Sequence, residues 1–414
     1  MNLLRFTTIQ KLLFLKNLHC NTKSNRLKFM LMKTTLVRRK KSTVLIRRKA
    51  PAVLIRRKVR TVLIRRKVPT VLITGGTGFL GVHLARLFIT KKYRVILLDT
   101  SPLTAKDIEK KVFVEKIDIT NIKDIQKVFV KYKIDFVVHA AAALPIQHSK
   151  EIIFNVNVTG TKNILETSKK NFVKRLVFIS TTAMYGVPKN LPEKETDAIN
   201  PIGYYGESKA LGEKLCLEYQ KKGLEVNILR PKSFLGPERL GIFTLWFEAV
   251  YKNKPVFILG SGNNLYQLLE VHDVCQAIDR ALTSKKSGEI INIGAQDFGT
   301  WRQDLNALIA HASSESKIIS FPVGASQFAL SILEKFNLSP IVAWHYKTFP
   351  VDSYVSIEKA KKLLGFQPTK SNKEILIESY DWYKKNRSKF IGKTGTTHRT
   401  VWNFKLLNLI TRFI

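Results

Sequence analysis

The sequence predicts an α/β fold: a doubly wound parallel sheet followed by a smaller C-terminal α/β region. Two observations support this class. From Val71 onward, strand-like apolar runs alternate with helical patterns about every 25–30 residues, as in parallel sheets with right-handed crossovers. The first predicted strand, Val71–Ile73, is joined to the first helix by a glycine-rich turn, Thr74–Gly81.

The bulk composition is that of a globular protein with a full apolar core. The 414 residues are 45% hydrophobic and 10% aromatic, and a chain of this length holds two domains or one large interleaved one. No apolar run of about 18 residues occurs, so we predict no spanning helix. Cys20, Cys216 and Cys275 show no paired spacing. They suit a reducing, cytoplasmic setting, and no metal site is predicted.

Basic charge is concentrated near the N-terminus. The formal net charge is +39, and residues 1–70 hold 21 of the 70 Lys and Arg residues but no Asp or Glu. The remaining chain is still basic, which suits anionic ligands such as phosphates or an anionic membrane surface. Charge alone makes no strong case for nucleic-acid binding.

Residues 1–69 form an extension that contains a nine-residue repeat. Val-Leu-Ile-Arg-Arg-Lys recurs at 44–49, 53–58 and 62–67, and the next Val-Leu-Ile belongs to the first strand. Three interpretations stay open. The extension is disordered and without function (or an unused upstream start), it targets the protein to an organelle, or it lies on anionic lipid or nucleic acid. We expect the first.

The turn Thr74–Gly81 has the pattern of a dinucleotide-binding loop. In such a loop one glycine makes the tight turn, one lets backbone amides approach a pyrophosphate, and one allows close helix–strand packing. The helix N-terminus adds partial positive charge. We therefore predict cofactor contacts from Gly75, Gly78, Phe79, Leu80 and Gly81. An ordinary turn is the alternative, because a glycine triplet alone is weak evidence.

An acidic residue ends the second predicted strand, Tyr93–Asp99. Asp99 lies about 20 residues beyond the loop, where a carboxylate accepts both hydroxyls of an adenosine ribose. A 2′-phosphate would meet like charge there, and Thr100 and Ser101 offer no arginine to receive it. NAD is therefore favoured over NADP.

The next two strand ends extend the predicted cofactor site. Asp118, followed by Ile119, ends the third strand and is placed to face the adenine amino group. The fourth strand ends in Ala140 and Ala141, whose small side chains let the backbone lie close to a cofactor. The neighbouring His139 is expected to pack or to bond the backbone.

A tyrosine and a lysine one helical turn apart form the predicted reaction centre. Tyr205 and Lys209 share one face of a helix, because positions i and i+4 lie together. A neighbouring ammonium stabilises phenolate and moves its pKa toward the working range, so Tyr205 is the candidate base. Thr181, at the end of the preceding strand, would orient the substrate oxygen.

Together these motifs resemble the extended short-chain dehydrogenase/reductase family, in its NAD-dependent epimerase/dehydratase branch. The resemblance runs from about Val71 to Lys385 and includes Asn157, Leu229–Pro231 and Leu364–Pro368. It implies a Rossmann domain with bound NAD, with Tyr205 as base, Lys209 as its tuner and Thr181 assisting, together with the adjacent Ser180 or Thr182. Thr182 is also a candidate substrate contact. Asn157 would support the cofactor site. Members often pair through helices, so the helix with Tyr205–Glu218 is the candidate face of a homodimer.

The resemblance also implies a domain division. Residues 70–231 form the NAD-binding domain and 232–386 the substrate-binding region, with about 270–297 returning to the first domain. Residues 387–414 form a tail that, like the basic N-terminus, is a candidate for peripheral membrane contact.

Departures from the family pattern concern the substrate. Family dehydratases carry acidic residues just after the catalytic threonine, whereas this chain has Thr182 and Ala183, so dehydration is disfavoured. Nucleotide-sugar epimerases usually place an asparagine and an arginine where this chain has Ser233 and Tyr266. The loss of these diphosphate contacts would need compensation, for which the basic pair Lys232 and Arg239 is the candidate.

The predicted function is that of an NAD-dependent epimerase acting on a nucleotide-sugar or related hydroxylated substrate, with hydride transfer and return. Large apolar residues at 240–251 predict a core helix or, alternatively, an apolar substrate wall. The wall motivates a second hypothesis, a hydroxysteroid-dehydrogenase-like oxidoreductase acting on an apolar or lipid-linked alcohol. A third is an NAD-binding sensor without turnover.

Overall fold

The computed structural model describes residues 68–145, 149–239, 241–336, 338–339 and 341–389. All belong to one compact unit, Arg66–Ile414. The expectations for the N-terminal repeat, Cys20 and residues 390–414 therefore lie outside the described residues. The division at residue 231 stays a prediction, and the two regions are described as parts of one unit.

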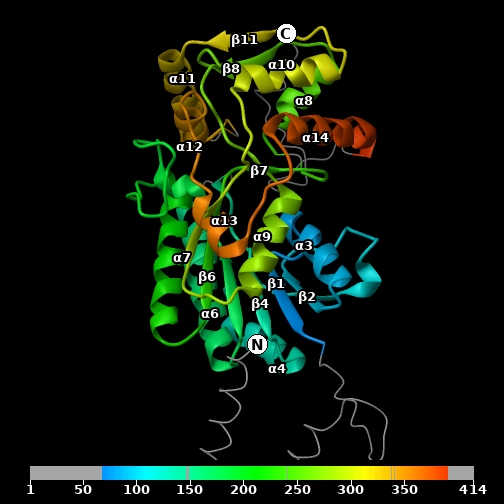
Figure 1. The fold of residues 1–414 in the computed structure, drawn as a ribbon, viewed down its shortest axis with the longest axis vertical. Helices are drawn as coiled ribbons and strands as arrows, with labels where there is room; N and C mark the ends of the chain where they lie inside the picture. The colour runs from blue at the N-terminus through cyan, green and yellow to red at the C-terminus, as the bar shows by residue number, and fades with distance from the viewer. Residues whose placement is uncertain (1–67, 146–148, 240, 337, 340, 390–414) are drawn as a thin grey trace, which may run out of the picture. The chain divides into compact units, whose positions relative to one another are not determined.

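The described chain contains a seven-stranded, all-parallel sheet in the order β10-β6-β5-β4-β1-β2-β3 (Figure 1). This order reverses direction beside β1, which makes the sheet doubly wound. The predicted fold class is confirmed. The strands are β1 (Thr70–Thr74), β2 (Arg94–Asp99), β3 (Phe113–Lys116), β4 (Phe136–His139), β5 (Arg175–Ile179), β6 (Val226–Pro231) and β10 (Ile290–Ile293).

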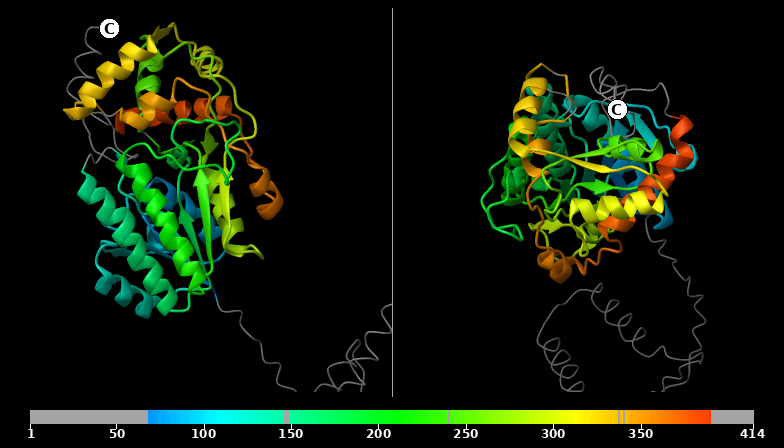
Figure 2. Two further views of the ribbon diagram at one scale, coloured as in Figure 1. Left: turned by 90° about the vertical axis from the view of Figure 1, so that its left-hand side faces the viewer. Right: turned by 90° about the horizontal axis from the view of Figure 1, so that it is seen from above.

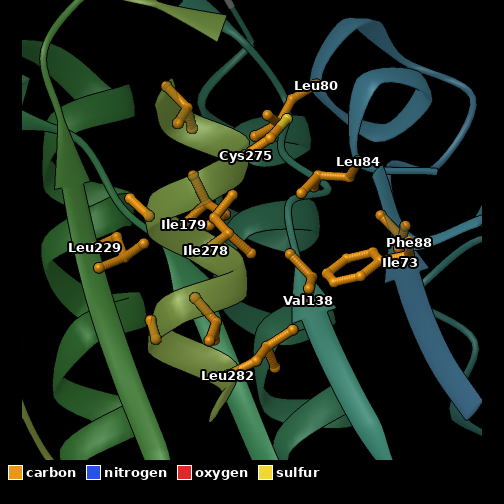
Figure 3. Packing of buried hydrophobic residues seen from close by; sticks show 14 of the residues in the cluster. Ile73, Leu80, Leu84, Phe88, Val138, Ile179, Leu229, Cys275, Ile278 and Leu282 are labelled. Carbon is orange, nitrogen blue, oxygen red and sulfur yellow. The ribbon is translucent and has the colours of Figure 1, made fainter. Parts of the chain in front are cut away.

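Helices cover both faces of the sheet (Figure 2). One face packs α3 (Phe79–Thr90) and α9 (Val271–Thr283) over the centre of the sheet, with α13 (Glu358–Leu364) beside α9. Leu80, Leu84 and Phe88 of α3 recur at helical spacing and meet Ile278 and Leu282 of α9 (Figure 3). Cys275 is buried among them. Because the apolar face of α3 is buried against α9 and the sheet, the first turn of α3 is held in place. The glycine turn that precedes it is held against the sheet in the same way.

The opposite face packs α4 (Ile122–Tyr132), α6 (Thr161–Lys170) and α7 (Gly203–Lys221). Before α6, the short helix α5 (Lys150–Phe154) begins after Ser149, whose side chain caps the N-terminus by accepting from Ile152 N. A six-residue π-helical segment at 155–160 then joins α5 to α6. Single-turn π segments of this kind are frequent at functional sites.

The remaining elements surround a third apolar core. It contains Trp301, Phe247 and Tyr266, and the rings of Tyr266 and Trp301 stack with their centres 4.4 Å apart. Its elements are two short parallel pairs, β8 (Val256–Leu259) with β11 (Ile318–Phe321) and β7 (Phe234–Leu235) with β9 (Leu269–Glu270), and five helices, α8 (Thr244–Tyr251), α10 (Trp301–His311), α11 (Val323–Lys335), α12 (Ala343–Thr348) and α14 (Asn372–Asn386).

Both interpretations of the apolar stretch 240–251 apply, since Phe243 belongs to the third core and also lines the large cavity. Phe247 and Val250 of α8 are buried in the third core. Ile242 and Phe243, which precede the helix, line the large cavity described below. Among the described helices none has the length and apolar character to cross a membrane, and the described part of the chain holds no cluster of His, Cys, Asp or Glu suited to a metal ion.

Candidate active site

A cavity of about 2070 Å³ lies at the carboxyl ends of the parallel strands. One wall comes from the glycine turn and the ends of β2, β4 and β5, and the other comes from the segment 231–243 and from α12. Ligands of open parallel sheets bind outside the carboxyl ends of the strands, where the strand order reverses. The cavity has the volume to hold a cofactor and a substrate together.

Backbone packing in the glycine turn explains its glycines. Gly75 has φ +68°, and a Cβ there would lie 2.9 Å from Ala141 N. A Cβ on Gly81 would lie 2.4 Å from Gly75 O, so this residue permits the close packing of α3 against the turn without lining the cavity itself. Gly76, which the spacing argument passed over, is equally restricted, because its Cβ would meet Leu97 Cβ at 2.7 Å. Gly78, Phe79 and Leu80 line the cavity.

Asp99 is held in the cavity wall by two backbone amides. Thr77 N donates to its Oδ2 at 3.1 Å and Ser101 N to its Oδ1 at 3.0 Å. Each oxygen retains a lone pair for a ribose hydroxyl. Asp99 forms no ion pair with any described residue. Asp118 and Ile119 line the same wall, and Asp118 Oδ1 accepts from Thr120 N.

A buried hydrogen-bond chain holds the end of β4. His139 Nδ1 lies 2.6 Å from Thr74 Oγ1, which accepts from Ala141 N, and His139 Nε2 lies 2.9 Å from Thr161 Oγ1. Thr161 donates to Asn157 O, so it accepts from His139, whose proton is then on Nε2. Burial lowers the pKa of His139 to about 3, helped by the charge of Lys209. The ring is therefore neutral, and it bonds side chains where backbone groups were the expectation.

Asn157 supports the site from behind the wall. Its side chain accepts from Ala143 N at 2.7 Å and donates to Ala143 O and to Ser208 Oγ. It lies in the π-helical segment, is buried, and does not line the cavity. Its contacts tie the loop that contains Ala140 and Ala141, both cavity residues, to the helix that carries Tyr205.

Two hydroxyls at the end of β5 face the cavity. Thr181 Oγ1 accepts from Ala183 N at 3.1 Å, which orients the side chain and leaves its proton available to a ligand. Ser180 lines the cavity, and its buried Oγ has no hydrogen-bond partner among the described residues. Thr182 is buried behind them and does not line the cavity, whereas Ala183 does. Position 183 therefore offers no acid or base.

Tyr205 and Lys209 both line the cavity from the first turns of α7. Lys209 Nζ donates to Ile179 O at 2.5 Å and lies 4.2 Å from the centre of the Phe178 ring. Burial lowers the pKa of Lys209 to about 8. Burial also raises the pKa of Tyr205 to about 12, and the charge that opposes this rise is that of Arg239.

Arg239 is the cation of the opposite wall. Its guanidinium lies 5.4 Å from the Phe79 ring centre and 5.0 Å from that of Phe234. Burial lowers its pKa to about 10, while Tyr205 acts to raise it. Among the described side chains, Arg239 acts to lower the pKa of Tyr205, and the tuning role that the sequence argument assigned to Lys209 stays a prediction. Arg239 was predicted as a substrate residue, and its relation to Tyr205 was missed.

Helix α12 contributes residues that no motif indicated. His345 and Trp344 line the cavity. His345 Nδ1 accepts from Val342 N at 3.3 Å, which places the ring proton on Nε2. Burial, helped by the charge of Arg239, lowers the pKa of His345 to about 4. A neutral donor and a cation thus share this wall with apolar groups.

The other predicted substrate residues divide between cavity and core. Ser233 lines the cavity. Lys232 lines it as well, but its Nζ donates to Ser353 Oγ at 2.8 Å. Tyr266 is fully buried against Trp301 and is not part of the cavity wall. A direct substrate contact of Tyr266 is therefore not supported, because its ring completes the third core.

Comparisons with known proteins identify the family. The model of the NAD dependent epimerase/dehydratase family matches residues 71–294. Uncharacterized protein y4nG of Sinorhizobium fredii is 32% identical over 82% of this chain and 84% of its own. UDP-glucuronate 4-epimerase of Thermodesulfobacterium geofontis is 27% identical over 76% of this chain and 96% of its own. The decarboxylating sterol-4-alpha-carboxylate 3-dehydrogenase of Mus musculus is 25% identical over 76% and 92%.

The crystal structure of Thermus thermophilus UDP-glucose 4-epimerase in complex with NAD is similar in fold. Its TM-score is 0.63 at 26% identity, covering 76% of this chain and 99% of that one. The chain belongs to the NAD-dependent epimerase/dehydratase family of enzymes. The resemblance inferred from the motifs is thereby confirmed, and NAD is the cofactor. The tight glycine turn and the two free lone pairs of Asp99 fit that cofactor.

Proposed function

We propose that the protein is an NAD-dependent epimerase acting at a hydroxyl-bearing carbon of a nucleotide-activated sugar. One observation carries the proposal: Thr181, Tyr205 and Arg239 face the same cavity as the glycine turn and Asp99. Nucleotide-sugar epimerases among the relatives and structural neighbours support the substrate class.

Each residue has a role that its position supports. Bound NAD supplies the hydride acceptor and donor. Tyr205 takes the proton of the substrate hydroxyl while the C–H bond of the same substrate carbon breaks. After the keto intermediate has turned the other face of this carbon to the cofactor site, Tyr205 returns a proton to the substrate oxygen. Thr181 donates to the same oxygen and holds it near the phenol. Lys209 adds positive charge below the cofactor site. Because burial raises the pKa of Tyr205, catalysis requires nearby cations, and Arg239 is one.

Arg239 also addresses the missing diphosphate contacts. Tyr266 is in the core, so the guanidinium of Arg239 and the Nε2–H of His345 are the candidates to receive an anionic substrate group. Charge-assisted bonds from arginine to phosphate oxygens are strong because the geometry matches two oxygens at once.

A second candidate is favoured by the apolar side of the cavity. Ile242, Phe243, Trp344 and Phe349 line it, which suits an apolar or lipid-linked alcohol better than a sugar. The sterol dehydrogenase relative acts on a substrate of that kind, as its name states. In this case the hydride stays on the cofactor and NADH accumulates.

Turnover with defined substrates separates the candidates. The full-length protein is incubated with UDP-glucose, UDP-glucuronate or a 3-hydroxysteroid in the presence of NAD, and both absorbance of NADH and product identity are recorded. Inversion of the sugar without net NADH supports the epimerase, whereas stoichiometric NADH with the steroid overturns it in favour of the oxidoreductase. NAD binding without turnover of any substrate class supports a sensor and contradicts both.

A further inference from the structure

Helix α11 turns its apolar residues toward solvent. None of its 13 residues is buried, although helices of globular proteins normally bury their apolar stripe. Phe328 is 69% exposed, Ile332 42% and the adjoining Phe336 66%. Their spacing of four residues places them on one face of the helix. We call Phe328, Ile332 and Phe336 the α11 patch.

Polar contacts, and not this patch, hold α11 to the rest of the protein. Glu334 accepts from Ala343 N at 3.0 Å through Oε1 and from Tyr346 Oη at 2.9 Å through Oε2. Gln327 Nε2 donates to Tyr346 O at 3.1 Å. These bonds join α11 to α12, and they orient the helix with its patch outward.

The charge around the patch is positive. Three lysines are exposed: Lys317, which directly precedes β11, Lys335 on α11 and Lys347 on α12. Glu334 is the single acidic residue of the segment 316–349, and both its carboxylate oxygens are occupied within the protein. The patch thus offers apolar side chains and lysines together, the combination that binds an anionic lipid surface.

The same helix borders the cavity. Glu334 and Lys335 belong to the cavity wall, as does Trp344 of the adjoining α12. Figure 1 shows α11 and α12 side by side, away from the sheet. A surface that receives the α11 patch would therefore lie beside the entrance of the proposed active site.

We propose that the α11 patch docks the enzyme on an anionic lipid bilayer. Phe328, Ile332 and Phe336 enter the interfacial region while the lysines contact lipid phosphates. In this orientation the face that carries the α11 patch brings the cavity close to the bilayer. This holds whether the substrate is a nucleotide-activated sugar or an apolar alcohol.

A fluorophore on the same face tests the docking. Ala325 is exposed, three residues before Phe328, so Ala325→Cys retains the whole patch. In a Cys20→Ser background, with Cys216 and Cys275 buried, the polarity-sensitive dye NBD is attached to Ala325→Cys in the full-length protein. The matched control carries the dye at Phe172→Cys, a site that is 91% exposed and far from α11 in the chain.

Vesicles of phosphatidylcholine with phosphatidylglycerol should shift the emission of the dye on α11 to the blue and raise its intensity several-fold. The dye at position 172 should not respond, even if the basic N-terminus brings the protein to the vesicle. Adding Phe328→Ser and Phe336→Ser should abolish the response without lowering Tm, because both side chains are exposed.

Three outcomes would overturn the proposal. The dye on α11 does not respond to anionic vesicles, it responds equally after the serine substitutions, or its emission is already blue-shifted in buffer. The last result would mean that another segment of the chain or a second copy covers the patch. The dye experiment measures no turnover, so a negative result would not contradict the proposed epimerase activity. Likewise, absence of epimerase activity would not contradict a positive docking result.

Discussion

The two walls of the cavity are built differently. The cofactor wall consists of short, contiguous segments, Thr77–Leu80, Asp99–Ser101 and Ala140–Ala143, in which small side chains predominate. The opposite wall combines Arg239, Phe243 and His345, which come from separate segments and present long or aromatic side chains.

This difference indicates which kinds of substitution each wall can tolerate. The cofactor wall depends on distances between backbone atoms, so even a methyl group at Gly81 alters it. The substrate wall depends on side chains, so its chemistry can change without disturbing the fold. Tyr205 lies where the two walls meet, and its pKa responds to Arg239 on the far side.

The largest effect is expected where the walls meet. Tyr205→Phe removes the proton acceptor and should lower kcat about 10²–10⁴-fold while NAD still binds. Turnover of the accepted substrate and NAD affinity by calorimetry measure the two properties separately. Tyr219→Phe, on the same helix but in the apolar core beneath it, is the matched control and should retain activity. Equal kcat for Tyr205→Phe and the native protein would remove Tyr205 from the mechanism.

A smaller effect is expected on the cofactor wall. Gly81→Ala places a Cβ 2.4 Å from Gly75 O, so the turn must shift, at a cost of about 1–3 kcal/mol. We expect NAD affinity and Tm to fall together, as measured by calorimetry and thermal unfolding. Gly324→Ala meets no atom within 4 Å and should leave both unchanged or raise Tm slightly. An unaltered NAD Kd for Gly81→Ala would show that the turn is not the cofactor cradle.

The smallest effect is expected on the substrate wall, as a displaced pH profile. The guanidinium of Arg239 stabilises the Tyr205 phenolate and so lowers the phenol pKa from the raised value that burial imposes. Arg239→Gln removes this charge, so the pKa of Tyr205 rises.

The low-pH limb of kcat against pH, along which Tyr205 loses its proton and becomes active as a base, should then move upward by about one pH unit. Arg302→Gln, a change at an arginine bonded to Ser261 O and Ser320 Oγ, is the control. A pH profile of kcat that is unchanged in Arg239→Gln would show that Arg239 does not alter the pKa of Tyr205.

Local motifs indicated several residues that line the cavity. The sequence indicated Gly75, Asp99, Thr181 and Tyr205 because each is tied to a strand end or helix start, where neighbours along the chain decide the geometry. The structure brings all four to one cavity. Gly76 was missed because the spacing rule considered one glycine of the pair, although its clash with Leu97 comes from the next strand.

The substrate wall was not predictable in the same way. Tyr266 occupies a position that the family pattern marks as a ligand contact, yet its ring stacks on Trp301 in the core. No periodicity marks His345, and it reaches the cavity because polar bonds join α12 to α11. Lys209 has the predicted spacing from Tyr205, but its ammonium bonds Ile179 O.

By itself the sequence determined the doubly wound sheet, the glycine turn, the preference for NAD and the membership of the family. These follow from periodicity and from contacts between near neighbours in the chain. Only the tertiary structure decided which charge acts on Tyr205, which aromatic residues face the substrate and which face the core, and which face of α11 is exposed. Those outcomes depend on packing between segments far apart in the chain. Local sequence patterns reflect contacts between near neighbours and therefore cannot predict such long-range contacts.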